Sequence, residues 1–323
     1  MPLAPSSKSR PPLPKEFFWR EFVCPVSGQA FDSVAVKSSA VTVRSRGTDF
    51  RPAYEGINPL HYAIIVSPIG FAAEEERFRN PASLMFRDRD GLIGLLQSQP
   101  PQTDLCGIRD LPAVCRAYQL ALSCTGFYKT PRSEIAGLAL RTSWMLLELA
   151  ESGDALAADQ AVALRNIAVE QYLEAFEKED VTKLRSGSGG VAYLIAELMR
   201  QQRRYDDSLR WFSIVVADKS TATEVMRLAR NQMEICREER TAAKAAGEYE
   251  KPKLERQTER SMYQIFRDQS QWLGQQAERG ALSESAILRG VIDGLKAGGL
   301  NAADFKAEQD LADWLAAKIT EQQ

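Results

Sequence analysis

The chain has 323 residues, of which 44% are apolar and 26% charged, and its formal net charge is −2. This composition is typical of a globular protein and supplies enough material for one large domain or two to three ordinary ones. The near-neutral charge excludes a global field that would draw the chain to nucleic acid or anionic lipid. The apolar runs are too short to span a bilayer, so no membrane insertion is expected.

Residues 1–15 are rich in Pro and Ser and contain Lys8 and Arg10, but they lack the apolar stretch of a signal peptide. We therefore expect a disordered lead-in to a cytoplasmic protein. The five cysteines form an odd, scattered set, which is typical of reduced thiols in that compartment.

Residues 16–80 have the pattern of a β-rich module. Apolar and polar residues alternate from Phe31 to Val43, which predicts a strand, and Tyr62–Val66 is a short apolar run that suits a buried strand. The segment between them contains several Gly and Pro residues, which predict turns.

Two segments of this module have the frame of zinc knuckles: Cys24–Gly28 (Cys-Pro-Val-Ser-Gly) and Ser67–Phe71 (Ser-Pro-Ile-Gly-Phe). A zinc ribbon needs two Cys-Pro-x-Cys-Gly turns because four thiolates bind the ion tetrahedrally. Only Cys24 is present at these positions, so no metal or other cofactor is expected. We predict that burial of aromatic residues holds the module and packs it on the helical part. These residues are Phe17, Phe18, Trp19, Phe22, Phe31, Phe50, Tyr54 and Tyr62. The alternative is that Phe17–Trp19 is an exposed interaction peptide.

Residues 81–250 change to a helical period, with apolar residues three and four positions apart from about residue 108. Breaks are expected at Thr130-Pro131, at 152–154 and at 186–190. The last, Ser-Gly-Ser-Gly-Gly, lacks the lysine of a phosphate-binding loop and is interpreted as a flexible linker. The stretch Ala192–Ala217 matches the order of large and small residues in a tetratricopeptide hairpin, although Arg203 and Ser208 depart from it. A tetratricopeptide-like helical domain is predicted, with a generic bundle as the alternative.

No catalytic constellation is visible. His61 is the only histidine, and its place beside a predicted strand indicates a structural role. The acidic run 74–76 lacks a spaced partner residue. Cys106, Cys115 and Cys124 recur every nine residues, which does not place them on one helix face. The chain is therefore not expected to be an enzyme.

A resemblance can be stated on five segments: Cys24–Gly28, Arg46–Tyr62, Ser67–Ala73, Leu138–Leu149 and Ala196–Lys219. Together they resemble the uncharacterised bacterial family called domain of unknown function 2225, over roughly residues 16–245. The resemblance implies a zinc-ribbon-like start fused to tetratricopeptide-like helices, with no established activity. The chain departs from the family pattern where the metal ligands should be, so zinc binding is not carried over.

Residues 251–323 lie beyond this resemblance and have helical stripes that predict a C-terminal extension, either a cap or a small domain. The segment Trp272–Leu295 is similar to the two helices of ribbon-helix-helix DNA-binding proteins. Those proteins dimerise through a strand before the first helix, whereas Ser261–Arg267 has a helical stripe. Acidic residues also outnumber basic ones from 255 to 323, which disfavours phosphate contacts.

The sequence thus predicts an α+β, mainly α protein: a zinc-ribbon-like module packed on a tetratricopeptide-like domain, with a helical tail. We expect a non-enzymatic scaffold or adaptor that binds another protein. In the tetratricopeptide register, Tyr193, Glu197, Arg200 and Gln201 point into the groove and are free of packing. The alternative is a DNA-associated regulator that uses the tail.

Overall fold

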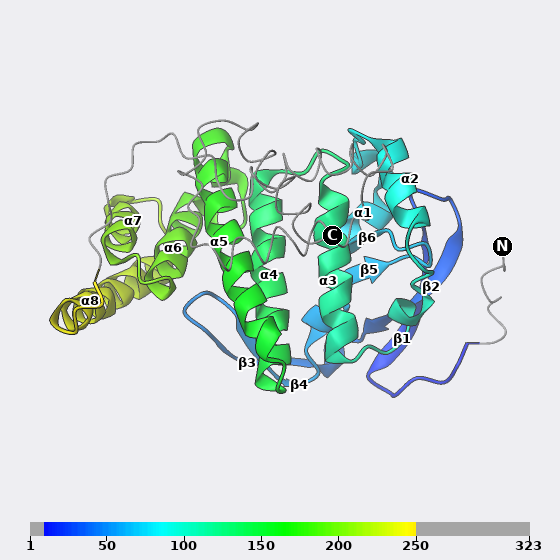
Figure 1. Cartoon of the computed structure of the whole chain (residues 1–323), viewed down its shortest axis with the longest axis horizontal. Helices are drawn as coiled ribbons and strands as arrows, with labels where there is room; N and C mark the ends of the chain where they lie inside the picture. The colour runs from blue at the N-terminus through cyan, green and yellow to red at the C-terminus, as the bar shows by residue number, and fades with distance from the viewer. Residues whose placement is uncertain (1–9, 250–323) are drawn as a thin grey trace, which may run out of the picture. The chain divides into compact units, whose positions relative to one another are not determined.

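The computed structural model describes residues 10–249, which belong to one compact unit (Figure 1). The predicted C-terminal extension, with its ribbon-helix-helix-like segment, lies outside the described residues. None of the helices within 10–249 combines the length and apolarity needed to cross a bilayer.

The N-terminal part contains three antiparallel strand pairs. They are β1 (Phe17–Val23) with β2 (Ala30–Val36), β3 (Val41–Arg46) with β4 (Pro52–Gly56), and β5 (Ile64–Val66) with β6 (Ala72–Glu74). The single strand predicted from Phe31 to Val43 is wrong in one respect. A turn of 3-10 helix at 38–40 divides it, so that its two halves pair with different partners.

The two knuckle-like segments are the turns of the first and third strand pairs. The N–H of Cys24 donates to Gln29 O at 2.9 Å, and the N–H of Gly28 donates back to Cys24 O at 2.8 Å. In the third pair, the N–H of Gly70 donates to Ser67 O at 2.8 Å. Both glycines have positive φ, 72° for Gly28 and 91° for Gly70, a region that favours glycine because it has no Cβ. The two turns are therefore alike in ending on a glycine of positive φ, but the first is one residue longer than the second.

An aromatic cluster lies beneath these turns. Phe22 and Phe31 from the first pair and Phe71 from the third each lie within 5.5–5.8 Å of Phe78, measured between ring centroids. Cys24 is buried in the same core. The other aromatics predicted to replace the metal, Phe17, Phe18 and Trp19 among them, are only partly buried. The core was thus predicted in kind, but it uses fewer of the early aromatics and adds Phe78.

The rest of the described chain is helical. The helices are α1 (Glu75–Arg79), α2 (Arg89–Gln97), α3 (Leu111–Thr125), α4 (Arg132–Glu151), α5 (Ala155–Lys178), α6 (Gly187–Gln201), α7 (Tyr205–Ala217) and α8 (Thr223–Ala245). From α3 onward each helix packs on the next one in the chain. Asp110 and Asp154 begin α3 and α5, because each side chain accepts a hydrogen bond from an N–H of the first turn.

The predicted breaks near residues 130 and 153 fall between helices, but the linker at 186–190 is wrong. Gly187 begins α6, and the glycines form its first turn. Gly189 explains why: a Cβ at this position would lie 2.2 Å from Oγ1 of Thr221, which stands just before α8. The glycines allow close packing of α6 and add no flexible joint.

Candidate functional site

The loop between β3 and β4 docks on the helices. Its ends close on each other, because the N–H of Gly47 donates to Arg51 O at 2.7 Å. Phe50 has a φ of 65°, an unusual backbone conformation for a bulky residue. Its ring stacks on that of Tyr193 in α6, with centroids 5.0 Å apart and planes 25° from parallel. Figure 1 shows the β3–β4 pair extending along the helices towards α6.

Asp49 ties the same loop to α4. Its carboxylate is buried, accepts the indole N–H of Trp144 at 2.7 Å and also accepts the N–H of Arg51 at 3.1 Å. Each of the two carboxylate oxygens of Asp49 thus accepts one hydrogen bond. The Asp-Phe-Arg-Pro segment that carried the resemblance is thus the part of the strand region that connects it to two helices.

Glu197 in α6 is the most enclosed carboxylate of this region, with 0% of the residue exposed. It accepts hydrogen bonds from Thr48 at 2.6 Å, from Arg200 at 2.8 and 2.9 Å and from Gln201 at 3.0 Å. Arg200 in turn contacts Glu239 of α8 at 2.5 Å. The hydrogen bonds that Arg200 donates to Glu197 raise the pKa of Arg200 above its ordinary value. These contacts fasten the loop, α6 and α8 to one another.

The expectation that four residues of α6 point into a groove free of packing is therefore wrong: two are fully buried, and Arg200 and Gln201 are bonded to Glu197. Tyr193 and Glu197 are both 0% exposed, since the chain's own loop covers that face of α6. The Tyr193 hydroxyl donates to Thr48 O at 2.9 Å. Arg200 and Gln201, at the end of the helix, do line an open pocket.

Glu148 forms a second junction, between α4 and the segment after β4. Its Oε1 accepts the side-chain amide of Asn58 at 2.9 Å, and its Oε2 lies 2.6 Å from Nε2 of His61. Arg51 approaches at 3.5 Å. Burial alone would raise the pKa of Glu148, but the hydrogen bond and charge of His61, followed by those of Arg51, outweigh it and lower that pKa. His61 is thus engaged in a structural contact.

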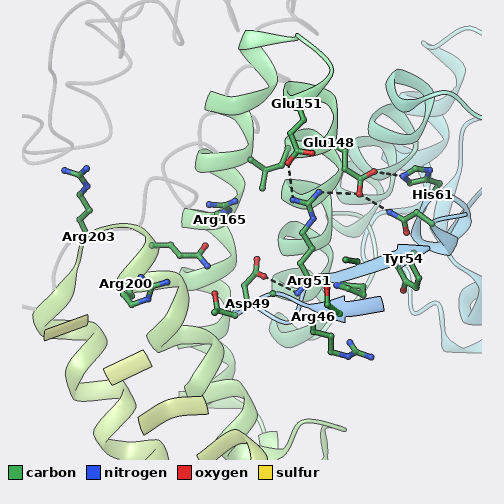
Figure 2. Close-up of a pocket in the computed structure, with 18 of the residues that line it drawn as sticks. Arg46, Asp49, Arg51, Tyr54, His61, Glu148, Glu151, Arg165, Arg200 and Arg203 are labelled. Atoms are coloured by element: carbon green, nitrogen blue, oxygen red, sulfur yellow. Dashed lines mark hydrogen bonds and ion pairs between the residues drawn. The ribbon is translucent and has the colours of Figure 1, made fainter. Parts of the chain in front are cut away.

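Between these junctions lies a pocket with a volume of about 1560 Å³ (Figure 2). Its walls are the β3–β4 pair, the C-terminal ends of α4 and α6, one residue of α5 and the C-terminal half of α8. Most arginines of the lining have partners. Arg109 donates to backbone carbonyls of Leu105, His61 and Ile64, and Arg203 contacts Glu248 at 2.8 Å.

Arg165 of α5 differs from them. Its Nε is buried and has no hydrogen-bond partner among the described residues. Burial lowers its pKa most, the charge of Asp49 opposes this, and the charge of Arg51 adds to it. Figure 2 shows Arg165, Asp49 and Arg51 in the middle of the labelled lining residues, between Arg200 and His61.

The two knuckle-like turns do not fit a zinc ion. Ser27 and Ser67 stand where thiolates would be needed, and Cys24 alone supplies sulfur. Within residues 10–249, no group of three or more His, Cys, Asp or Glu side chains is arranged to hold a metal. The free thiols of Cys106, Cys115 and Cys124 are buried or partly buried, and this burial raises the pKa of each to about 11.

The described residues define a mainly helical protein with small antiparallel strand pairs near its N-terminus. The family described as "Uncharacterized protein conserved in bacteria (DUF2225)" matches residues 17–236, and the chain belongs to this family. The match runs from β1 into α8 and includes the docked loop and Arg165. No curated protein matches the chain, and no solved structure matches it.

Sequence reasoning missed Arg165 and Glu148. A signal for Arg165 was present: it is the only charged residue between Ala161 and Val169, a stretch of helix in which Asn166 is the one other polar residue. An arginine in such a place has no neighbour at i±4 with which to pair, so its partner must come from another element. Glu148 left no comparable signal, because its partners are distant in the chain.

Proposed function

We propose that the protein is a non-enzymatic interaction scaffold of the cytoplasm and that the pocket beside the β3–β4 loop binds a segment of another protein. In this proposal the strand region is a zinc-ribbon-like module without its metal. The helices from α3 onward serve as a tetratricopeptide-like support.

The size of the pocket carries the proposal. Its volume of about 1560 Å³ exceeds the roughly 300–1,000 Å³ of small-molecule sites, and such a space suits a peptide segment. Its lining mixes charged groups with apolar ones such as Ile57 and Leu147, which suits a chain with both kinds of side chain. The docked loop holds the pocket wall in place through contacts on both α4 and α6. A preformed wall favours binding because less ordering is needed when the partner arrives.

The chemistry of the region supports a non-enzymatic role. The single histidine is held against Glu148 at 2.6 Å, which leaves that nitrogen unavailable to a substrate. Thiols whose pKa is raised to about 11 carry little thiolate near neutral pH, and thiolate is the nucleophilic form.

Site-specific photocrosslinking in the native host tests the proposal. Benzoylphenylalanine is placed at Ala53 in β4 and at Ala246 just after α8, two exposed residues that line the pocket from different elements. Val162 on α5, which is 53% exposed and outside the pocket, is the control. We expect both pocket positions to yield the same crosslinked protein and the control position not to yield it. Absence of a shared product from the two walls would contradict the proposal.

The alternative, a DNA-associated regulator, rests on residues outside the described part of the chain. A gel-shift experiment distinguishes this alternative from the scaffold proposal. A regulator would shift DNA with an affinity that falls steeply as salt rises. The scaffold proposal expects no such shift from the full chain.

A further inference from the structure

Arg165 has an unmet hydrogen-bonding requirement in an open pocket. It belongs to α5 and lines the pocket, its Nε is buried, and no acceptor among residues 10–249 meets that N–H. Buried donors in proteins are almost always paired, so this N–H is a donor that a bound acceptor could satisfy.

The carboxylate whose charge acts on Arg165 is already engaged. Asp49 accepts Trp144 Nε1 at 2.7 Å and the N–H of Arg51 at 3.1 Å. It attracts Arg165 through charge, yet no hydrogen bond joins the two side chains.

Arg51 supplies a second guanidinium group, and this group makes only weak ion pairs with its neighbours. Its contacts are long, 3.5 Å to Glu148 and 3.8 Å to Glu151. Its charge also acts on Arg165, so two like charges face one region of the pocket. Arg200 contrasts with both, because its contacts with Glu197 and Glu239 are 2.5–2.9 Å long.

We propose that Arg165 and Arg51 form an oxyanion subsite of the pocket, and that it binds a side-chain carboxylate from an acidic segment of the partner protein. The proposal rests on the proposed function and adds the chemistry of the ligand. Arginine is well suited to a carboxylate, since its planar fork donates two parallel hydrogen bonds to the two oxygens.

The surrounding charges favour a carboxylate over a phosphate. Asp49, Glu148 and Glu151 lie beside the two arginines on the pocket wall. They would repel a dianionic phosphate more strongly than a singly charged carboxylate. The two oxygens of a carboxylate also match the small number of free N–H donors on Arg165 and Arg51.

The first test is a titration of the full chain with a capped tri-glutamate peptide, followed by NMR on the Arg165 Nε–H signal. That signal is identified by its loss in Arg165→Gln. We expect a saturable shift with tri-glutamate and little change with capped tri-glutamine. The shift should persist in Arg237→Gln, which removes an exposed arginine of α8 outside the pocket. A response to inorganic phosphate but not to tri-glutamate, or no response to either, would overturn the proposal.

The second test separates the subsite from the function. The Ala53 crosslinking experiment is repeated in Arg165→Gln, Arg165→Lys and Arg237→Gln. Loss of a charge-assisted hydrogen bond should lower the yield about tenfold in Arg165→Gln. The yield in Arg165→Lys should be intermediate, because the charge remains without the fork, and this variant also serves if Arg165→Gln folds poorly. An unchanged yield in Arg165→Gln would overturn the subsite and leave the proposed function standing. No crosslinked protein from the wild type would overturn the proposed function itself.

Discussion

At the scale of single residues, two carboxylates connect the strand region to the helices, one fully buried (Glu197) and one partly buried (Glu148). Glu197 joins the β3–β4 loop to α6, and Glu148 joins the segment after β4 to α4. Neither role was visible in the sequence. The tetratricopeptide register placed Glu197 on an open face because a single-helix pattern contains no information about a loop some 149 positions away. A structural role was expected for His61, and the structure shows its Nε2 paired with Glu148.

Glu197→Ala should destabilise the fold strongly. It removes a fully buried carboxylate and leaves Arg200 with only part of its partners. Breaking a buried ion pair by removing one member costs about 3–5 kcal/mol. Urea unfolding measures the change, with Glu234→Ala on the exposed side of α8 as the matched control. A loss below about 1 kcal/mol, which is typical of surface changes, would show that this cluster does not hold the loop.

Glu148 predicts how stability depends on pH. Its folded-state pKa is lower than the ordinary value of 4.5, so the ionised form stabilises the fold above that pH. This contribution is lost as the pH falls through the folded-state pKa. Glu148→Gln should therefore be less stable than the wild type at neutral pH, and the difference should shrink in acid. Urea midpoints measured from neutral pH down to below 4.5 check this. A constant difference across the range would contradict the assignment.

At the scale of elements, local signals predicted turns and helix breaks well, and long-range packing decided the rest. Gly28 and Gly70 mark turns because these turns need a residue with positive φ, which glycine adopts most readily. The glycines of 187–190 gave the same signal but begin α6, since Thr221 lies against them. That contact joins residues about thirty positions apart, and no local pattern contains it.

Gly189→Ala should destabilise the protein through overpacking. The new Cβ would lie 2.2 Å from Thr221 Oγ1 and 2.8 Å from its Cβ, and a threonine has no flexible end that could move aside. Overpacking of this kind costs about 1–3 kcal/mol. Gly94→Ala in α2 is the matched control, because no atom lies within 4 Å of its added Cβ. That variant should be neutral or more stable by up to about 1 kcal/mol. Thermal melts compare the two, and equal effects would contradict the packing account.

The knuckle-like turns predict the outcome of metal analysis. With one thiolate among the four positions, elemental analysis of the purified chain should find no stoichiometric zinc. A chelator should leave the melting temperature unchanged, because structural zinc contributes about 10–16 kcal/mol where it is present. About one zinc per chain, removable with a large fall in melting temperature, would contradict the view that Phe22, Phe31, Phe71 and Phe78 hold these turns.

At the scale of the whole described unit, the β3–β4 pair and parts of α4, α6 and α8 together line one pocket. The family resemblance pointed to the Asp-Phe-Arg-Pro segment without explaining it. The structure explains it as the segment that fastens β3–β4 to α4 and α6. Arg200 and Gln201 were predicted to face a binding groove, and they lie at the pocket that we propose as the partner site.

The central proposal is tested most directly by quantitative affinity purification with a variant in which a bulky side chain occupies the pocket. Ala53→Trp adds bulk at an exposed lining residue, and Val162→Trp adds the same bulk on an exposed face outside the pocket. Melting temperatures of both variants are first compared with that of the wild type, and neither should fall. We predict that proteins enriched by the wild type from its native host are lost with Ala53→Trp and retained with Val162→Trp. Recovery of the same proteins in the same yield from both variants would contradict the pocket as the binding face.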